Sequence, residues 1–192
     1  PAFAQLLSHL RINESTPEDI AFLHSLQENT VPRDSVKLFM TNRQVFIHNE
    51  IMLASLETEK IQIDSLDSKT DMQTQTVNIT IEDPNPHNTG GLHKTITVAK
   101  NARWIVTRNV DIADGLVNGS TGTIVDYNID PEAPLDGVIY VHFDNPKTGK
   151  EAKKYSPPNL KHAVPIKATI GKFILSKHAK VQVQRKQYPG QL

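Results

Sequence analysis

Two apolar stretches decide the fold of the second half of the chain: Ala102-Arg103-Trp104-Ile105-Val106-Thr107 and Thr121-Gly122-Thr123-Ile124-Val125-Asp126-Tyr127. A third apolar run, 138–143, follows a stretch rich in Asp, Pro and Gly. Short apolar runs separated by turn residues predict strands, and several such strands close together are typical of a small antiparallel barrel. The sequence therefore predicts an inserted all-β, SH3-like barrel over 100–163.

The first 60 residues have a different pattern. Apolar residues recur at helical spacing near the start, and Thr16-Pro17 is typical of a helix N-cap followed by its first residue. Residues 36–40 predict a short buried strand, which a polar turn connects to a helix with Asn49 and Leu53 on one side. A strand, a polar turn and a helix form half of a βαβ unit, so we expect an α/β domain over 1–60.

Two further regions complete the predicted organisation. Residues 61–99 are rich in Asp, Thr, Asn and Gln, which favours a variable excursion or linker, with an alternating strand at 77–81. Residues 164–192 predict strands that return the chain to the α/β domain. The chain begins inside an amphipathic pattern and stops after a predicted strand, so we expect a piece of a longer protein.

The formal net charge is zero, but the charge is unevenly distributed. Residues 1–98 hold 7 basic and 13 acidic residues, a net charge of −6, and 99–192 hold 14 and 8, a net charge of +6. Within 147–192 there are 11 basic residues and one acidic residue, a net charge of +10. This imbalance suits a phosphate-bearing partner, although a solvated lysine surface is the simpler alternative.

Several classes of protein are disfavoured. The absence of cysteine excludes disulfides and thiolate metal sites, and no histidine has partners at metal-ligand spacing. No apolar run is long enough to span a bilayer, so no membrane partner is expected. Without a secretory signal, an intracellular location in the nucleus, cytoplasm or mitochondrion is expected.

Two stretches resemble the PIF/RecD-like branch of superfamily-one DNA helicases, Helitron-encoded members included. Residues 37–45, with Asn49, resemble the family's strand, Thr-Asn turn and helix. Residues 102–110 and 114–125 resemble its strand ending in Arg-Asn and its "gly-leu-val-asn-gly" loop, and 185–189 resemble the return into the motor domain. The aromatic-Pro-Leu of that return is Tyr188-Pro189-Gly190 here.

The resemblance implies a partial RecA-like second motor domain with the barrel inserted. It further implies a parent ATP-dependent helicase that moves 5′ to 3′ and acts in DNA repair, recombination or telomere maintenance. The expected partners are single-stranded DNA and the first motor domain of the same parent chain. ATP and Mg²⁺ are cofactors of that parent, whereas this chain lacks the phosphate loop Gly-x-x-x-x-Gly-Lys-Ser/Thr, so we expect no bound cofactor, no catalytic residue and no activity alone.

The candidate DNA-binding residues each have a structural alternative. Thr41, Asn42 and Arg43 begin a helix, where backbone N–H groups attract phosphate but a simple N-cap is equally consistent. Asn118 and Gly119 form a tight turn that the family presents to DNA. For Arg108 and Asn109 we expect one residue to anchor this loop and the other to face phosphate.

The remaining candidates are cationic or supporting residues. Lys150 and Lys153 belong to a lysine cluster on a predicted barrel hairpin, which is either solvated or bound to phosphate. Trp104 is expected in the core rather than stacked on a base. Residues expected to support the DNA track are Asn49, Arg185 and Gln187.

Two rival functions remain open at this stage. One is a stand-alone single-stranded nucleic-acid-binding module, and the other is an SH3-like module for protein contacts. Salt dependence distinguishes the second, because only binding to nucleic acid weakens steeply as salt rises.

Overall fold

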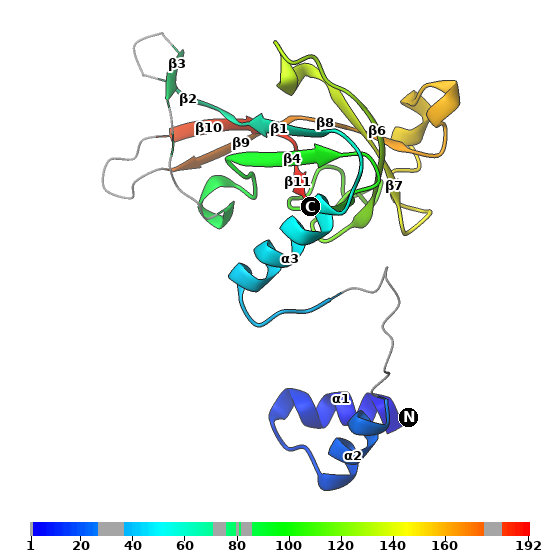
Figure 1. Ribbon diagram of the computed structural model, residues 1–192. Helices are drawn as coiled ribbons and strands as arrows, with labels where there is room; N and C mark the ends of the chain where they lie inside the picture. Colours follow the sequence, from blue (N-terminus) through cyan, green and yellow to red (C-terminus); the bar gives the residue numbers. More distant parts are fainter. Residues whose placement is uncertain (1, 27–36, 71–75, 80, 82–85, 175–181) are drawn as a thin grey trace. The chain divides into compact units, whose positions relative to one another are not determined.

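The computed structural model (Figure 1) describes every residue except 1, 27–36, 71–75, 80, 82–85 and 175–181. The chain divides into two compact units, Pro1–Val45 and Phe46–Leu192. Each unit is described by itself below.

The first unit contains helices α1 (Ala2–Ile12) and α2 (Pro17–Ser25). A capping box fixes the start of α2: the Thr16 hydroxyl accepts the Asp19 N–H, and the Asp19 carboxylate accepts the Thr16 N–H. The pKa of Asp19 is lowered, first by the hydrogen bond from the Thr16 N–H and next by a hydrogen bond with the His9 imidazole. The predicted helix start at Thr16-Pro17 is confirmed.

The strand predicted over 36–40 is wrong for its described part. Residues 37–39 have no regular structure, and Leu38 and Met40 are 93% and 97% exposed; Val36 lies outside the described residues. A strand requires a neighbouring strand to complete its hydrogen bonds. No described segment pairs with 37–40, so its apolar composition alone does not produce a strand.

Helix α3 (Asn42–Ala54) begins in the first unit and continues into the second. Within the second unit the two residues predicted for one side of this helix face inward: Leu53 is buried, and Asn49 is half-buried, as is Met52. The other side of the helix carries Phe46, which is exposed.

A five-stranded antiparallel sheet forms the barrel-like part, in the order β11-β5-β6-β7-β8. Its strands are β5 (Arg103–Val106), β6 (Thr121–Asn128), β7 (Val138–Phe143), β8 (Val164–Lys167) and β11 (Gly190–Gln191). The first three agree with the strands predicted inside 100–163, and a register shift between Ile124 and Asp126 bends β6. Residues 164–167 and 190–191 also join this sheet, although the sequence predicted that they return to the α/β domain.

Trp104 lies in the core of this sheet with Ile124, Val141 and Phe143, as predicted. A Cβ placed on Gly190 would clash with the indole ring of Trp104. Gly190 therefore stands where the family pattern has leucine because the tryptophan ring occupies the space that a leucine side chain needs.

Two smaller sheets lie beside it. One pairs β1 (Lys60–Asp64) with β4 (Thr95–Ala99), and the other has the order β3-β2-β10-β9. Its strands are β2 (Leu66–Thr70), β3 (Thr76–Ile79), β9 (Thr169–Ile174) and β10 (Gln182–Gln187). The pairs β1–β4 and β9–β10 can be followed in Figure 1.

These sheets correct the interpretation of 61–99 as a linker. Ile63, Ile96 and Val98 are buried in the main core, and the 3-10 turn η1 (Pro86–Thr89) precedes β4. The polar composition misled because the polar residues of β1 alternate with Ile61 and Ile63, which face inward. The predicted strand over 77–81 corresponds to β3, at the edge of the four-stranded sheet.

No helix among the described residues is both long and apolar enough to cross a membrane. No cluster of three or more histidine or acidic side chains that could hold a metal ion occurs in the part of the chain that the structure describes.

Candidate nucleic-acid interface

The loop between β5 and β6 ends in a tight turn at Asn118-Gly119. Ser120 N–H donates to the Val117 carbonyl at 3.0 Å, which closes the turn. Gly119 has φ +91°, a left-handed value that favours glycine at the third position of such a turn. No atom lies within 4 Å of a Cβ placed on Gly119, so the turn is open to a partner on that side.

The backbone N–H groups of this turn are already used inside the loop. Asn118 N–H donates to the Asn109 side-chain oxygen at 2.9 Å, and Gly119 N–H donates to the Val106 carbonyl at 2.8 Å. Asn109 is therefore the anchor of the loop. The group that the turn offers to a partner is the exposed side-chain amide of Asn118 rather than the backbone.

Arg108 is half-buried and points away from this turn. Its Cβ would lie 3.2 Å from a Cβ on Gly91, and its Nη1 is 2.7 Å from the position of a Cβ on Gly171. That Nη1 is buried and has no hydrogen-bond partner among the described residues. Arg108 thus packs between the Gly90-Gly91 turn and β9, and the structure does not bring its guanidinium to the Asn118 turn.

The lysine cluster lies in the connection between the antiparallel neighbours β7 and β8. After β7 the chain makes a turn at 145–148 and then the 3-10 helix η3 (Ala152–Tyr155), before η4 (Pro158–Leu160). We call residues 147–154 the lysine turn; they hold four lysines and one glutamate, a net charge of +3. The chain between β7 and β8 reverses its direction, and Gly149 and the buried Thr148 favour a compact turn over a strand.

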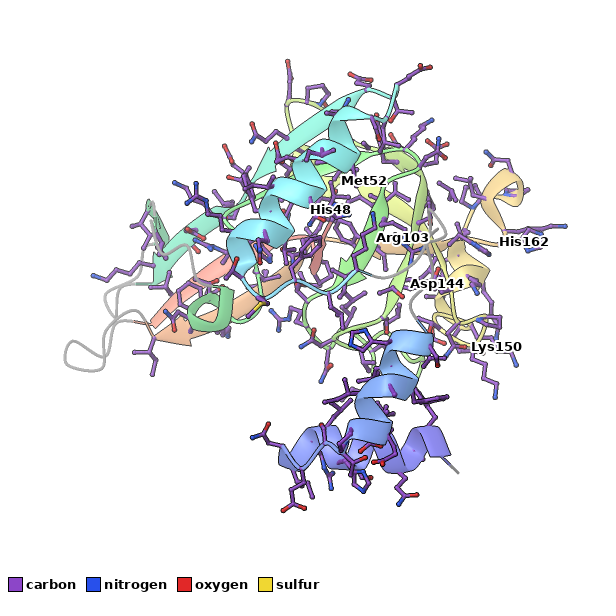
Figure 2. The ribbon with its side chains drawn as sticks, turned by 60° about the horizontal axis from the view of Figure 1, so that its bottom comes forward. His48, Met52, Arg103, Asp144, Lys150 and His162 are labelled. Atoms are coloured by element: carbon purple, nitrogen blue, oxygen red, sulfur yellow. The ribbon has the colours of Figure 1, made fainter. Side chains whose placement is uncertain are left out.

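The four lysines differ in their contacts. Lys154 pairs with Glu151 at 2.6 Å, and this pairing raises the pKa of Lys154. Lys153 donates to the Pro146 carbonyl at 3.3 Å. Lys147 and Lys150 are exposed, and Figure 2 shows Lys150 projecting outward from the turn.

A groove of about 630 Å³ brings the two segments together. One side is formed by residues between 112 and 121, which include Asn118 and Gly119, and the other by residues between 144 and 148, which include Lys147. The predicted Asn-Gly turn and the start of the lysine turn therefore share one surface. Lys150 and Lys153 follow in the chain but do not line the groove.

Asp144, which also lines this groove, was not predicted as a site residue. The Arg103 guanidinium donates to both of its carboxylate oxygens and, with Thr121, lowers the pKa of Asp144 to about 2. Arg103 and Asp144 are 52% and 48% exposed, and Figure 2 shows them close together. Because arginine neutralises this acid, the groove is less repulsive to an anion than its composition indicates.

Thr41, Asn42 and Arg43 belong to the other unit. Thr41 is the N-cap of α3: its hydroxyl accepts the Gln44 N–H, and the Gln44 side chain accepts the Thr41 N–H at 3.2 Å. This reciprocal pair is a capping box, so the structural alternative for Thr41 is confirmed. Arg43 is exposed on the first turn of the helix.

The three supporting residues make internal contacts. Asn49 donates to the Leu192 carbonyl at 3.0 Å. Gln187 is buried and donates to the carbonyls of Ile63 and Lys94, which connects β10 to the β1–β4 pair. Arg185 is also buried and pairs with Asp67.

Comparison with solved structures gives the same fold. The chain matches unliganded Pif1 from Bacteroides sp with a TM-score of 0.63 and 16% identity, over 100% of this chain and 38% of that one. It matches Pif1 helicase from Candida albicans with a TM-score of 0.60 and 18% identity, over 100% and 42%. Bacteroides Pif1 bound to ssDNA matches with a TM-score of 0.53 and 16% identity, over 99% and 37%.

These likenesses confirm the predicted fold class, a partial RecA-like domain with a β-barrel-like part. The chain spans about two fifths of the length of these helicases. No protein-family model matches the chain, and no curated protein is similar to it in sequence.

Proposed function

We propose that this chain is part of an ATP-dependent DNA helicase and that its groove binds the backbone of single-stranded DNA. The observation that carries the proposal is the groove itself, which joins the Asn118 turn to Lys147 at the start of the lysine turn. The fold supports it, since solved helicases share this fold and one of them was solved with ssDNA.

The chemistry of the groove suits a phosphate backbone. Asn118 offers two amide N–H donors and Lys147 an ammonium group, and both side chains are exposed. Of the two acids that line the groove, Asp114 is buried and Asp144 is paired with Arg103. The groove contains no aromatic side chain to stack a base, so the proposed contacts are to phosphate and are independent of base sequence.

The rest of the activity belongs to the parent protein in this proposal. ATP and Mg²⁺ are held by parts of the parent that this sequence does not contain, because it has no phosphate loop. The first motor domain closes against this one during each ATP cycle, and the strand moves through with 5′-to-3′ polarity. This chain supplies the DNA grip and, alone, does not hydrolyse ATP.

Fluorescence anisotropy with labelled oligo-dT at two salt concentrations tests the proposal. We expect binding that weakens steeply with salt, with log K falling by about 0.7 per phosphate contact against log salt. Asn118→Ala should weaken binding roughly tenfold, since a hydrogen bond to a charged group contributes about 1.5–3 kcal/mol. Lys150→Glu should weaken binding and flatten the salt dependence.

Matched controls lie at the other end of the same sheet. Asn128 and Lys167 are exposed, and both pair with Val138, at the opposite end of β7 from the groove. Asn128→Ala and Lys167→Glu should leave oligo-dT affinity within about twofold of wild type, as expected for exposed positions. Equal losses in these controls, or binding that does not respond to salt, would contradict a grip located in the groove.

A further inference from the structure

Asp114 connects the Asn118 loop to the lysine turn. Its side chain is buried, and its two carboxylate oxygens accept the backbone N–H groups of Glu151 at 2.8 Å and Ala152 at 2.9 Å. Its own carbonyl accepts the Gly149 N–H at 2.7 Å. One residue of the first segment therefore makes three hydrogen bonds to the backbone of the second.

These bonds determine where the lysine turn stands. Hydrogen bonds to an ionised carboxylate are roughly twice as strong as those between neutral groups, and these two are partly buried. Asp114 N–H in turn donates to the Asp111 carboxylate at 3.1 Å, so its own backbone is held by the loop that carries it. Lys150 lies between Gly149 and Glu151, both of which Asp114 holds.

We propose that Asp114 is a positioning residue that fixes the lysine turn beside the groove, so that Lys147 and Lys150 meet DNA phosphates. The inference rests on the proposed function and deepens it. Asp114 itself does not touch DNA in this proposal. Its oxygens accept backbone N–H groups, and a carboxylate that faced a phosphate would repel the DNA. Without the Asp114 carboxylate, the lysine turn changes conformation, and Lys147 and Lys150 no longer lie beside the bound single-stranded DNA.

Asp114→Asn is the direct test because it keeps the size of the side chain. The asparagine keeps one acceptor oxygen but places an NH₂ group against the second backbone N–H, where two donors oppose each other. Although the change removes a negative charge, we expect oligo-dT affinity to fall about tenfold at low salt. The salt dependence should flatten by about 1.4, the value for two lost phosphate contacts on a single strand.

Asp130→Asn is the matched control. Asp130 also accepts a backbone N–H, that of Glu132 at 2.9 Å, but it is exposed in the turn between β6 and β7, at the far end of that hairpin from the groove. The substitution makes the same change in net charge. It should leave affinity and salt dependence within about twofold of wild type.

A role in overall stability alone is distinguished by a double-mutant cycle. Lys150→Ala should flatten the salt dependence by about 0.7 in the wild-type background and have almost no effect beside Asp114→Asn, because the lysine is then already misplaced. A general loss of stability gives no such coupling. Hydrogen exchange at the Glu151 and Ala152 amides should also become faster in Asp114→Asn and stay unchanged in Asp130→Asn.

The outcomes separate this inference from the proposed function. If wild type does not bind oligo-dT, the proposed function is overturned and the inference with it. If wild type binds but Asp114→Asn binds equally well with the same salt dependence, only the role of Asp114 is overturned. If Asp114→Asn does not fold, the double variant Lys147→Ala/Lys150→Ala decides alone: an unchanged salt dependence overturns the inference, because neither lysine then makes a phosphate contact.

Discussion

Among the residues that the structure describes, an arginine–aspartate ion pair occurs in the four-stranded sheet and another in the five-stranded sheet, and the two pairs lie in opposite environments. Arg185 and Asp67 are 0% and 4% exposed and face each other across β10 and β2. Arg103 and Asp144 are about half exposed, and Asp144 lines the groove. The interior of the five-stranded sheet is instead apolar, with Trp104 packed against Gly190.

The comparison shows that an arginine–aspartate pair has a structural role where it is buried and a role in surface charge where it is exposed. Burying two charges is costly unless every polar atom is satisfied. Arg185 meets that condition, because it also donates to the carbonyls of Leu92 and Ile81 at 3.2 Å. All three guanidinium nitrogens of Arg185 thus have partners inside the protein, and its side chain is 0% exposed, so it is not accessible to DNA. The exposed pair instead neutralises charge on the surface where a ligand would bind.

Breaking the buried pair should have the largest effect. Arg185→Met leaves Asp67 buried without its partner, and we expect the free energy of unfolding to fall by about 3–5 kcal/mol. Urea denaturation of the purified chain measures it. The double variant Arg185→Met/Asp67→Asn should recover part of the loss, since the uncompensated charge is gone. A loss under 1 kcal/mol for Arg185→Met would show that the pair does not hold the four-stranded sheet together.

The apolar interior of the five-stranded sheet should be sensitive to volume rather than charge. Gly190→Leu places a side chain where the Trp104 ring stands, and overpacking of this kind costs about 1–3 kcal/mol. In a Trp104→Leu background the same substitution should cost less or become favourable, because the ring that blocks it is absent. Thermal unfolding of the four proteins gives the coupling; additive effects would contradict the contact.

The strands of the barrel-like part could be predicted because their partners are close in the sequence. The apolar runs at 102–107, 121–127 and 138–143 each pair with the next run along the chain, and the turn residues between them are informative. The Asn118-Gly119 turn was recognisable for the same reason. The run at 36–40 has no such neighbour, and its exposed described residues show that apolar composition does not define a strand by itself.

The contacts that local pattern could not give are those between distant residues. Asp67 and Arg185 are 118 positions apart, and Asp114 reaches Glu151 across 37. The local sequence around these residues does not show whether a charged side chain is buried against a partner or exposed to solvent. The change from the family's leucine to Gly190 was visible in the sequence, but its reason, the ring of Trp104, appears only when β11 pairs with β5.

The exposed pair should contribute least, and its contribution should depend on pH. The pKa of Asp144 is lowered to about 2 from its ordinary 3.8, first by hydrogen bonds from Arg103. A lowered carboxyl pKa stabilises the fold above the unfolded value, near 4, and that stability is lost as pH falls through about 2. Because both side chains are half exposed and screened, we expect less than about 1 kcal/mol.

An NMR titration of the Asp144 carboxyl carbon measures that pKa directly. In Arg103→Gln the midpoint should rise toward 3.8, and the difference in unfolding free energy between the two proteins should be present at pH 7 and absent near pH 2. Molar salt should shrink the difference at pH 7, whereas it should hardly change the loss in Arg185→Met, since buried charges are little screened. A wild-type midpoint near 4 would mean that the exposed pair does not form, and the groove would then present an uncompensated negative charge to any phosphate.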